Sequence, residues 1–420
     1  MKVVVCGPAP KKLSARGDLS ITMMNGGEVG GTSGTVGRTF REEVRKSGLA
    51  PTLPAWDFAA IALAVTAADK GCLRKASSDG WTRQIELHVA LADSSVWEPQ
   101  RTRLESALNF LSGDMWTLHL HDGGLKPLSR SGRVRRRPVQ GDSVSLLSGG
   151  LDSLIGALDH AAAGRKPVLV SQKAKGDSAN QVRFARQIAG AASHVQLSHA
   201  TCIPFKTERS ERVRSLFFLA LGALTASSLR KASNVDLYVP ENGFISYNVP
   251  LTNIRLGSLS TRTTHPYFLD TIAEIWRAVG MDVSILNPYQ HVTKGEMLER
   301  CRDQAALSAL AAASTSCGRF ARYKYTHCGL CVPCLVRRAA FIKWGKMDST
   351  TYARQDLGAA TDHDDVRSVG VACVAARAGV DRWARNALNS QYVDDRGAAE
   401  AVVGRGLDEL GSLLQAHGVL

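Results

Sequence analysis

The chain has 420 residues, of which 44% are hydrophobic and 21% are charged, and its formal net charge is +14. This length suffices for two or three domains with hydrophobic cores. No apolar run approaches the length of a membrane span, and the apolar start at residues 3–6 is too short for a signal peptide. The positive charge is compatible with a nucleic-acid, nucleotide or acidic-protein partner. The nine cysteines, an odd number with one tight cluster, favour a reducing cytoplasm and a metal site over disulfides.

Residues 1–140 are expected to form an N-terminal α/β region. Apolar patterns with the periods of strands and helices alternate along it. The expected elements are strands over residues 1–6, 84–91 and 115–120 and helices over residues 56–68 and 101–111. This order indicates a small α/β subdomain, whose sheet could also continue into the residues that follow.

Two stretches of this region are expected to be loops. Asn25–Gly37 is rich in glycine, but no apolar strand precedes it and no helix opens directly after it. A mobile loop is therefore favoured over a phosphate-binding loop. Residues 126–141 form a basic linker that contains five arginines between Arg130 and Arg137. Such charge runs are usually solvated, and a contact with nucleic acid or an acidic partner is the alternative.

The segment Ser143–Ser153 reads Ser-Val-Ser-Leu-Leu-Ser-Gly-Gly-Leu-Asp-Ser. Val144–Leu147 is typical of a buried parallel strand, and apolar residues at helical spacing follow, so a helix is expected to begin at Asp152 or Ser153. A strand, a glycine turn and a helix N-terminus together make an anion site. Glycine lets backbone N–H groups approach a phosphate, and the helix dipole favours negative charge. The loop is not a Walker A loop, because no Gly-Lys-Ser/Thr follows the turn.

From this segment onward, strands and helices alternate, which is typical of a doubly wound parallel sheet in an α/β fold. The expected strands are residues 144–147, 168–171, 195–197, 235–239 and 283–286, and the expected helices are residues 179–192, 212–229 and 294–303. Ligands of such sheets bind at the carboxyl ends of the strands. The loop after Val239 is therefore expected beside the loop at Ser148.

Cys317, Cys328, Cys331 and Cys334 have the spacing C-x10-C-x2-C-x2-C. Thiolates separated by two residues bind one metal ion from a tight turn, and Gly329 suits the first such turn. Four sulfur ligands close a tetrahedral Zn2+ shell and leave no open position. A structural zinc ion is therefore expected, with an iron–sulfur cluster as the alternative.

The string Ser148–Ser153 resembles the SGGxDS loop of the PP-loop, or N-type ATP pyrophosphatase, enzymes. Together with the cysteine cluster about 170 residues later, it resembles the 7-cyano-7-deazaguanine synthase (QueC) family over residues 143–345. Arg214, Thr293–Glu296 and Thr315–Cys317 resemble further motifs of that family. The chain is about twice as long as a housekeeping member. In size and layout it is most similar to the QueC-like subunits of the Qat anti-phage defence system.

The resemblance implies a PP-loop domain at residues 141–345, with an adenine nucleotide α-hydrolase-like sheet and the zinc-binding four-cysteine element. The N-terminal region 1–140 and a helical extension 346–420 would flank it. In the family, the loop holds the β- and γ-phosphates of ATP while the carboxylate of 7-carboxy-7-deazaguanine attacks the α-phosphate. Pyrophosphate leaves, an amine displaces AMP to give an amide, and a second activation yields the nitrile. Because two anions must meet, Mg2+ and cationic side chains are expected in the site.

The same resemblance assigns site residues. The expected ATP-binding residues are Ser148, Gly149, Gly150, Leu151, Asp152 and Ser153. The expected catalytic residues are Asp152, as a magnesium ligand or loop organiser, and Lys294 and Arg214, as cations for phosphate or carboxylate. The residues expected to line the substrate pocket are Glu241, Asn242, Gly243 and His265.

Two departures from the family prevent its substrate from being transferred directly. The family's Asp-Tyr-Ser-Gly-Tyr-Pro-Asp-Cys run, which helps to hold the deazaguanine, is replaced in the segment that begins at Pro240. Its Asp-Tyr-Gly-Gln is replaced by Ser171–Ala174, which alters the adenosine side of the site. A deazapurine-type small molecule remains the expected substrate class.

The acceptor amine could belong to a partner protein from the same operon, so that the product is a nucleobase–protein conjugate. The extra N- and C-terminal regions would then hold that partner.

Beyond Trp344 the chain carries no catalytic signature, and helices are expected over residues 366–378, 382–388 and 398–416. The expected location is the cytoplasm, without a membrane. Two other interpretations stay open: a PP-loop tRNA-modifying enzyme, favoured by Arg135–Arg137, and a scaffold that uses the loop as a nucleotide sensor.

Overall fold

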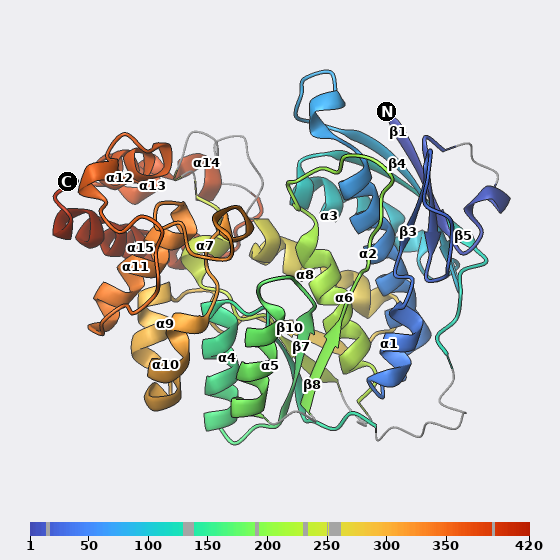
Figure 1. Ribbon diagram of the computed structural model, residues 1–420, viewed down its shortest axis with the longest axis horizontal. Helices are drawn as coiled ribbons and strands as arrows, with labels where there is room; N and C mark the ends of the chain where they lie inside the picture. The colour runs from blue at the N-terminus through green and yellow to red at the C-terminus, as the bar shows by residue number, and fades with distance from the viewer. Residues whose placement is uncertain are drawn as a thin grey trace.

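The computed structural model describes residues 1–13, 17–128, 138–189, 193–229, 234–249, 251, 262–388 and 391–420. Across these residues the strands form two five-stranded sheets in which all neighbouring strands are parallel (Figure 1). The first sheet contains β1 (Lys2–Gly7), β2 (Leu19–Met23), β3 (Ser33–Val36), β4 (Gln84–Leu91) and β5 (Met115–Asp122). The second contains β6 (Ser143–Leu146), β7 (Pro167–Gln172), β8 (His194–Leu197), β9 (Val235–Tyr238) and β10 (Val283–Leu286). The predicted basic residues 130–137 lie outside the described residues.

The first sheet has the order β3-β2-β1-β4-β5 and is separate from the second, so it does not continue into the residues that follow, a possibility that the sequence had left open. Its helices are α1 (Phe40–Lys46), α2 (Leu53–Gly71) and α3 (Arg101–Ser112). The two strands missed in the sequence are β2 and β3, and β3 lies inside the stretch Asn25–Gly37 that was predicted as a loop. Gly34 explains the miss, because it weakens the strand pattern; a side chain there would meet the carbonyl oxygen of Cys202.

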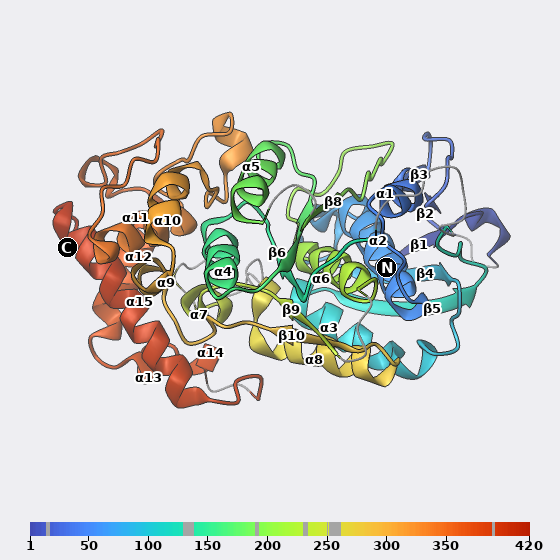
Figure 2. The same ribbon diagram turned by 90° about the horizontal axis from the view of Figure 1, so that it is seen from below.

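The second sheet has the order β10-β9-β6-β7-β8. The helices around it are α4 (Leu151–Ala162), α5 (Ser178–Ile188), α6 (Arg214–Ala226), α7 (Gly243–Ser246), α8 (Pro266–Ala278), α9 (Lys294–Arg300) and α10 (Gln304–Leu310). Figure 2 shows α4 and α5 on one side of the strands and α6 and α8 on the other. The strand order reverses at β6, and helices cover both faces. The second sheet is therefore doubly wound, as predicted.

One hydrophobic core joins the two sheets. α2 is apolar on nearly all sides, as expected of a helix that is buried between the first sheet and α6. Phe58 of α2 meets Trp276 of α8 edge to face, with ring centroids 5.3 Å apart, and both side chains are fully buried. The predicted domain boundary at residue 140 stays a prediction, although one hydrophobic core contains residues from both sides of it.

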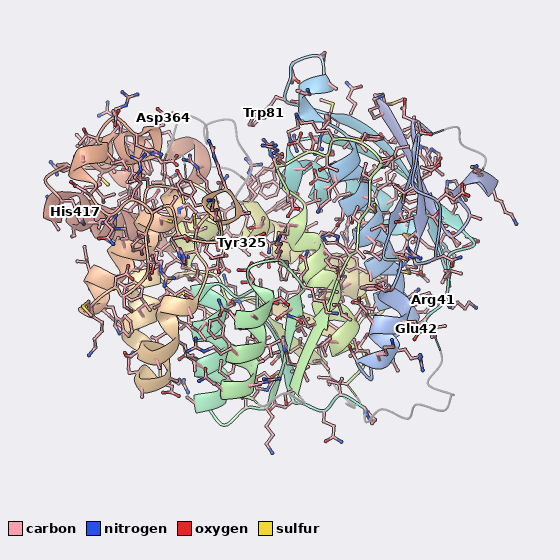
Figure 3. All side chains as sticks on the ribbon, in the orientation of Figure 1. Arg41, Glu42, Trp81, Tyr325, Asp364 and His417 are labelled. Atoms are coloured by element: carbon pink, nitrogen blue, oxygen red, sulfur yellow. The ribbon has the colours of Figure 1, made fainter. Side chains whose placement is uncertain are left out.

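The chain beyond α10 forms a mostly helical layer. Its helices are α11 (Val332–Trp344), α12 (Asp364–Ala376), α13 (Val380–Trp383), α14 (Arg385–Leu388) and α15 (Arg396–Ala416). A second hydrophobic core joins α11 to α12 and α15. In Figure 3 Arg41 and Glu42 mark the end of the molecule at α1, Asp364 and His417 mark the end at the C-terminal helices, and Tyr325 lies between them. Within the described residues, no helix has the length and apolarity needed to cross a membrane.

A buried ion-pair network stabilises one end of the first sheet. Asp114, which precedes β5, accepts hydrogen bonds from Arg74 Nη1 and Nη2 at 2.7 and 2.8 Å and from Arg83 Nη2 at 2.6 Å. Asp69 is a further partner of Arg83. Burial raises the pKa of Asp114, but its hydrogen bonds and its attraction to Arg83 and Arg74 outweigh burial and hold that pKa below its usual value. Asp114 is thus ionised, and both of its carboxylate oxygens accept hydrogen bonds from arginine side chains.

Asp114→Asn is expected to lower the free energy of unfolding by about 3 kcal/mol, because two guanidinium groups would stay buried without their shared carboxylate. Urea unfolding monitored by circular dichroism measures the change. The matched control is Glu98→Gln, which removes an exposed carboxylate 2.8 Å from Arg101 and should cost less than about 1 kcal/mol. Similar losses for both variants would contradict the importance of the buried network.

Candidate active site

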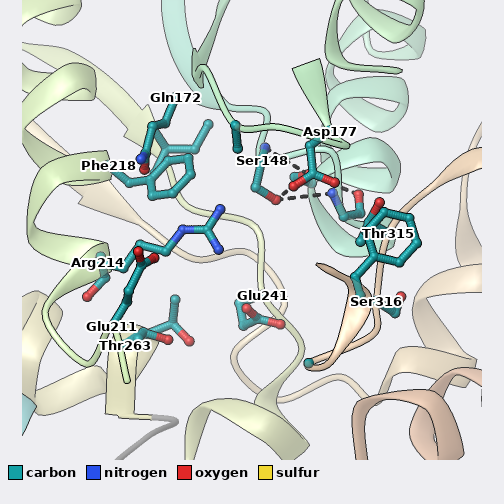
Figure 4. A pocket seen from close by; sticks show the side chains of 18 of the residues that line it. Ser148, Gln172, Asp177, Glu211, Arg214, Phe218, Glu241, Thr263, Thr315 and Ser316 are labelled. Atoms are coloured by element: carbon teal, nitrogen blue, oxygen red, sulfur yellow. Dashed lines mark hydrogen bonds between the residues drawn. The ribbon is translucent and has the colours of Figure 1, made fainter. Parts of the chain in front are cut away.

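A cavity of about 910 Å3 lies at the carboxyl ends of the second sheet (Figure 4). Its walls are the loops that follow β6, β7, β8 and β9, the first turn of α6, and the segment Thr315–Gly318. Lys70, at the end of α2, joins this wall from the N-terminal region. The cavity lies where the strand order reverses, which is the usual ligand site of a doubly wound sheet. Its volume is in the upper range of small-molecule sites, so it can hold a nucleotide and a second small ligand.

The loop at Ser148 joins β6 to α4, and its residues Ser148, Gly150 and Ser153 line the cavity. Gly149 has a φ of +94°, a left-handed conformation that glycine adopts without strain. Ser148 N–H donates to Ser153 Oγ at 3.2 Å, and Gly150 N–H donates to Ser148 Oγ at 3.2 Å. The two serine hydroxyls therefore hold the turn in shape from within.

The N-terminus of α4 opens toward this turn. Gly150 is its N-cap residue, and no side chain caps the helix. The N–H groups of the first helical turn have no acceptor within the helix, and the helix dipole adds partial positive charge there. The loop and the helix N-terminus thus have the strand, turn and helix arrangement that the sequence predicted, and their binding of an anion stays a prediction.

Five basic residues also line the cavity: Lys70, Lys173, Lys175, Arg209 and Arg214. In Figure 4 the guanidinium group of Arg214 points into the cavity, between Ser148 and Glu241. Among the described residues, Arg214 Nε has no hydrogen-bond partner although it is buried. Lys70, by contrast, is paired with Glu211 at 2.9 Å. Arg214 is therefore a cation placed to bind an anionic ligand.

Asp152 lies behind the loop at the centre of a buried polar cluster. Its Oδ1 pairs with Lys294 Nζ, and its Oδ2 accepts hydrogen bonds from the backbone and side-chain nitrogens of Asn242 at 3.1 and 2.7 Å. Burial raises the pKa of Asp152, but the charge of Lys294 and the hydrogen bonds outweigh burial and lower that pKa to about 2. Asp152 thus fixes the loop after β9 and the start of α9 relative to the Ser148 loop.

Glu241 is the member of this cluster that faces the cavity. Burial, and then the neighbouring carboxylate of Asp152, raise the pKa of Glu241 well above its usual value. The raised pKa favours the neutral form of Glu241 beside the carboxylate of Asp152. Because its carboxyl group faces the cavity, Glu241 is the residue of this cluster that could offer an oxygen ligand to a divalent cation there.

The predicted site residues fall into two groups. The structure brings Ser148, Gly150, Ser153, Arg214 and Glu241 together at the cavity wall. Those behind or away from the wall are Gly149, Leu151, Asp152, Asn242, Gly243, His265 and Lys294. Leu151 contributes its side chain to the hydrophobic core, and Asn242 caps α7.

His265 does not line the cavity. It precedes α8, is buried, and lies edge to face with Phe110 at 5.0 Å. Burial, and then Arg262, lower the pKa of His265 to about 3, so it is neutral. The neighbouring Thr263 and Thr264 line the cavity in its place.

Several cavity residues were not predicted as binding residues, although Lys173 lies in the Ser171–Ala174 segment that was expected on the adenosine side of the site. Lys173 and Lys175 follow β7 directly, and His199 follows β8. A signal was present in the sequence, because polar residues just after parallel strands collect at one edge of the sheet. Lys70 and Arg209 carried no such signal, since only tertiary packing brings them to the cavity.

The four cysteines Cys317, Cys328, Cys331 and Cys334 are buried and form one cluster that can hold a metal ion such as zinc. The sulfurs of Cys317 and Cys331 are 3.9 Å apart, and those of Cys328 and Cys334 are 3.8 Å apart. A tetrahedral zinc ion with bonds of about 2.3 Å places its sulfur ligands about 3.8 Å apart. Gly329 has a φ of +88°, and a side chain there would collide with the carbonyl oxygen of Arg354. The geometry thus fits the closed four-sulfur shell of a structural site.

The cysteine element also shapes the cavity wall. Thr315 N–H donates to the carbonyl oxygen of Gly149 at 2.9 Å. The fully buried Arg337 donates to Ser314 Oγ at 2.9 Å and to Ser316 Oγ at 3.1 Å. The segment between Ala313 and Cys317 therefore connects the cysteine cluster to the Ser148 loop.

The C-terminal helix α15 reaches the same region. Glu409 accepts hydrogen bonds from Thr293 Oγ1 and from Gly295 N–H, at the helix start that carries Lys294. Burial, and then the charge of Glu296, raise the pKa of Glu409 to about 7. α15 thus holds the start of α9 in place through the carboxyl group of Glu409, whose pKa is near neutral.

Glu409 is expected to make stability depend on pH. Its pKa is higher in the folded state than in the unfolded state, so its stabilising contribution is complete below about pH 4.5 and is lost as pH rises through 7. The loss amounts to about 3 kcal/mol by the usual linkage. Glu409→Gln should therefore flatten the dependence of the melting temperature on pH between pH 5 and 8. Glu400→Gln, which changes a partly exposed carboxylate of α15 paired with Arg396, is the control, and parallel profiles for all three proteins would contradict the assignment.

Comparisons of this chain with protein-family models, with curated proteins and with solved structures found no match.

Proposed function

We propose that the protein is an ATP-dependent ligase that activates a carboxylate as its adenylate and transfers it to an amine, releasing AMP and pyrophosphate. One observation carries the proposal: the Ser148 loop and the open N-terminus of α4 face a large cavity at the switch point of the sheet. Such a site suits the terminal phosphates of ATP. The SGGxDS string, which resembles the PP-loop, supports an attack on the α-phosphate over a transfer of the γ-phosphate.

The residues have distinct roles in this proposal. The loop and the first turn of α4 bind the β- and γ-phosphates through N–H groups and serine hydroxyls. Arg214 offsets the charge that develops on the α-phosphate as the carboxylate approaches. Glu241, which faces the cavity, is the residue that would hold Mg2+, and Asp152 positions Glu241 and Lys294 from behind. Mg2+ would neutralise phosphate charge and favour the departure of pyrophosphate.

The likeness to the QueC family supports 7-carboxy-7-deazaguanine as the carboxylate. The basic lining supports an acidic substrate, and the cavity has room for one beside the nucleotide. The cysteine element is proposed to bind a structural Zn2+. The amine is ammonia or the N-terminus of a partner protein, and the protein as acceptor would give the extra N- and C-terminal regions a binding role in anti-phage defence.

The test is to incubate the full-length protein with ATP, Mg2+ and 7-carboxy-7-deazaguanine and to quantify AMP and pyrophosphate. Ammonium or a candidate partner protein is then added, and mass spectrometry identifies the product. Release of AMP and pyrophosphate that requires the deazapurine supports the proposal. The amine that yields a product is then identified as the acceptor. Release that requires tRNA instead would indicate a tRNA-modifying enzyme. Tight ATP binding without any AMP would indicate a nucleotide-sensing scaffold.

Arg214→Ala is expected to lower kcat/KM for AMP formation about 100-fold, equivalent to about 2.7 kcal/mol of transition-state stabilisation. The reason is the loss of a cavity cation whose Nε has no partner among the described protein groups. Arg183→Ala removes an exposed arginine of α5 and should change kcat/KM less than twofold. An unchanged kcat/KM in Arg214→Ala would show that its guanidinium does not contact the reacting phosphate.

A further inference from the structure

A group of metal-binding side chains lies on the first sheet, far from the cysteine cluster in sequence. Glu86 and His88 belong to β4, and His119 and His121 belong to β5. The two strands are parallel neighbours, with His88 opposite His119 and Ala90 opposite His121. Because side chains alternate along a strand, all four side chains lie on one face of the sheet. The intervening residues are apolar and point to the other face, which α2 and α3 cover.

The donor atoms already have the spacing of a coordination shell. Glu86 Oε1 lies 3.0 Å from His88 Nε2 and 3.3 Å from His119 Nε2. A tetrahedral zinc ion with bonds of about 2.0–2.1 Å to nitrogen and oxygen sets its ligand atoms about 3.3 Å apart. One donor atom each from Glu86, His88 and His119 lie within 4.8 Å of one another, so a single ion can contact all three.

His121 completes the arrangement from behind. Its Nε2 lies 3.0 Å from His88 Nδ1, the ring nitrogen that faces away from Glu86. The ring of His88 is stacked on His119 at 4.4 Å and on His121 at 5.2 Å. Metal-binding histidines commonly donate their second ring N–H to such an acceptor, which fixes the tautomer and leaves the first nitrogen free for the metal.

We propose that Glu86, His88 and His119 bind a Zn2+ ion, with His121 as the hydrogen-bond partner that orients His88. Imidazole and carboxylate donors suit this metal. The side chain of His119 is 42% exposed and that of Glu86 is 22% exposed, so the ion can enter from solvent. Three protein ligands leave one coordination position for water or a small anion, whereas the four cysteines would close their shell. The two sites therefore differ in kind, and this one does not depend on the proposed ligase activity.

The test is the zinc content of the full-length protein after equilibration with micromolar Zn2+ at pH 7.5 and gel filtration. The expected result is two zinc ions per chain for the wild type and one for His88→Gln, His119→Gln and Glu86→Gln. The zinc that remains at the cysteine cluster, together with an unchanged melting temperature, shows that each variant is folded. His291→Gln, an exposed histidine elsewhere, should keep both ions.

Isothermal titration with Zn2+ gives an independent measurement. Protein that retains only its cysteine-bound zinc should bind one further equivalent, and His119→Gln should lower the affinity at least tenfold. His121→Gln should weaken binding by about tenfold without abolishing it, as expected of an orienting residue. One zinc per chain in the wild type, or a second zinc that persists in all three ligand variants, would overturn the proposal.

Discussion

Asp152→Asn is expected to lower kcat for AMP formation about 100-fold without raising the Mg2+ concentration needed for half-maximal activity. The carboxylate has no direct access to the cavity, because Lys294 and Asn242 occupy both of its oxygens. Asparagine keeps the shape but removes the charge that holds Lys294 and the loop after β9 in place. A 100-fold loss corresponds to about 2.7 kcal/mol, a common magnitude for one misplaced electrostatic group.

Glu241→Gln should behave differently, because Glu241 faces the cavity. Its loss is expected to raise the half-saturating Mg2+ concentration at least tenfold. In Asp152→Asn, the pKa of Glu241 should instead fall, since its anionic neighbour is gone, and metal binding should be no weaker. Activity titrated against Mg2+ at fixed ATP separates the two roles.

The control for both variants is Glu299→Gln, which changes an exposed carboxylate on the helix that carries Lys294. It should leave both kcat and the Mg2+ requirement within twofold of the wild type. If Asp152→Asn raised the Mg2+ requirement as much as Glu241→Gln, Asp152 would be a metal ligand and not a positioning residue.

The sequence predicted the second sheet well because its signals are local. The apolar run before Ser148 and the glycine turn after it specify a strand and a helix start within a few residues. β3, which reads Ser-Gly-Thr-Val, was missed because it carries little hydrophobic periodicity. β2, which reads Leu-Ser-Ile-Thr-Met, alternates apolar and polar residues, so its sequence did carry a strand signal. α8 was missed because its start, Pro266, lies in a segment that resembled part of a substrate loop.

Apart from Arg214, which the family resemblance assigned, the site was predictable mainly where residues follow strands. Ser148 and Glu241 come after β6 and β9, so the topology alone brings them to one edge. That Asp152 and Lys294 would pair with each other, and so be withdrawn from the cavity, depends on packing between α4 and α9 and on no local pattern. The same holds for Glu409 and for the histidines of β4 and β5, whose alignment depends on the strand register.

Cys331→Ser is expected to remove the metal of the cysteine cluster and to impair the cavity as well as local stability. The free energy of unfolding of this part should fall by about 5 kcal/mol, because a structural zinc ion contributes directly to folding. The cavity should also be distorted, because the hydrogen bond from Thr315 to Gly149 joins the segment that carries Cys317 to the Ser148 loop.

Three measurements on Cys331→Ser test this coupling. Metal analysis should show one zinc fewer per chain, and amide hydrogen exchange should show lost protection at Thr315. AMP formation should fall more than tenfold. Cys301→Ser, which changes a buried cysteine outside the cluster, should keep the zinc, the protection and the activity. Full activity in a Cys331→Ser protein that has lost its zinc would show that the Ser148 loop keeps its shape without the cysteine element. The cluster would then serve only the C-terminal layer, through α11.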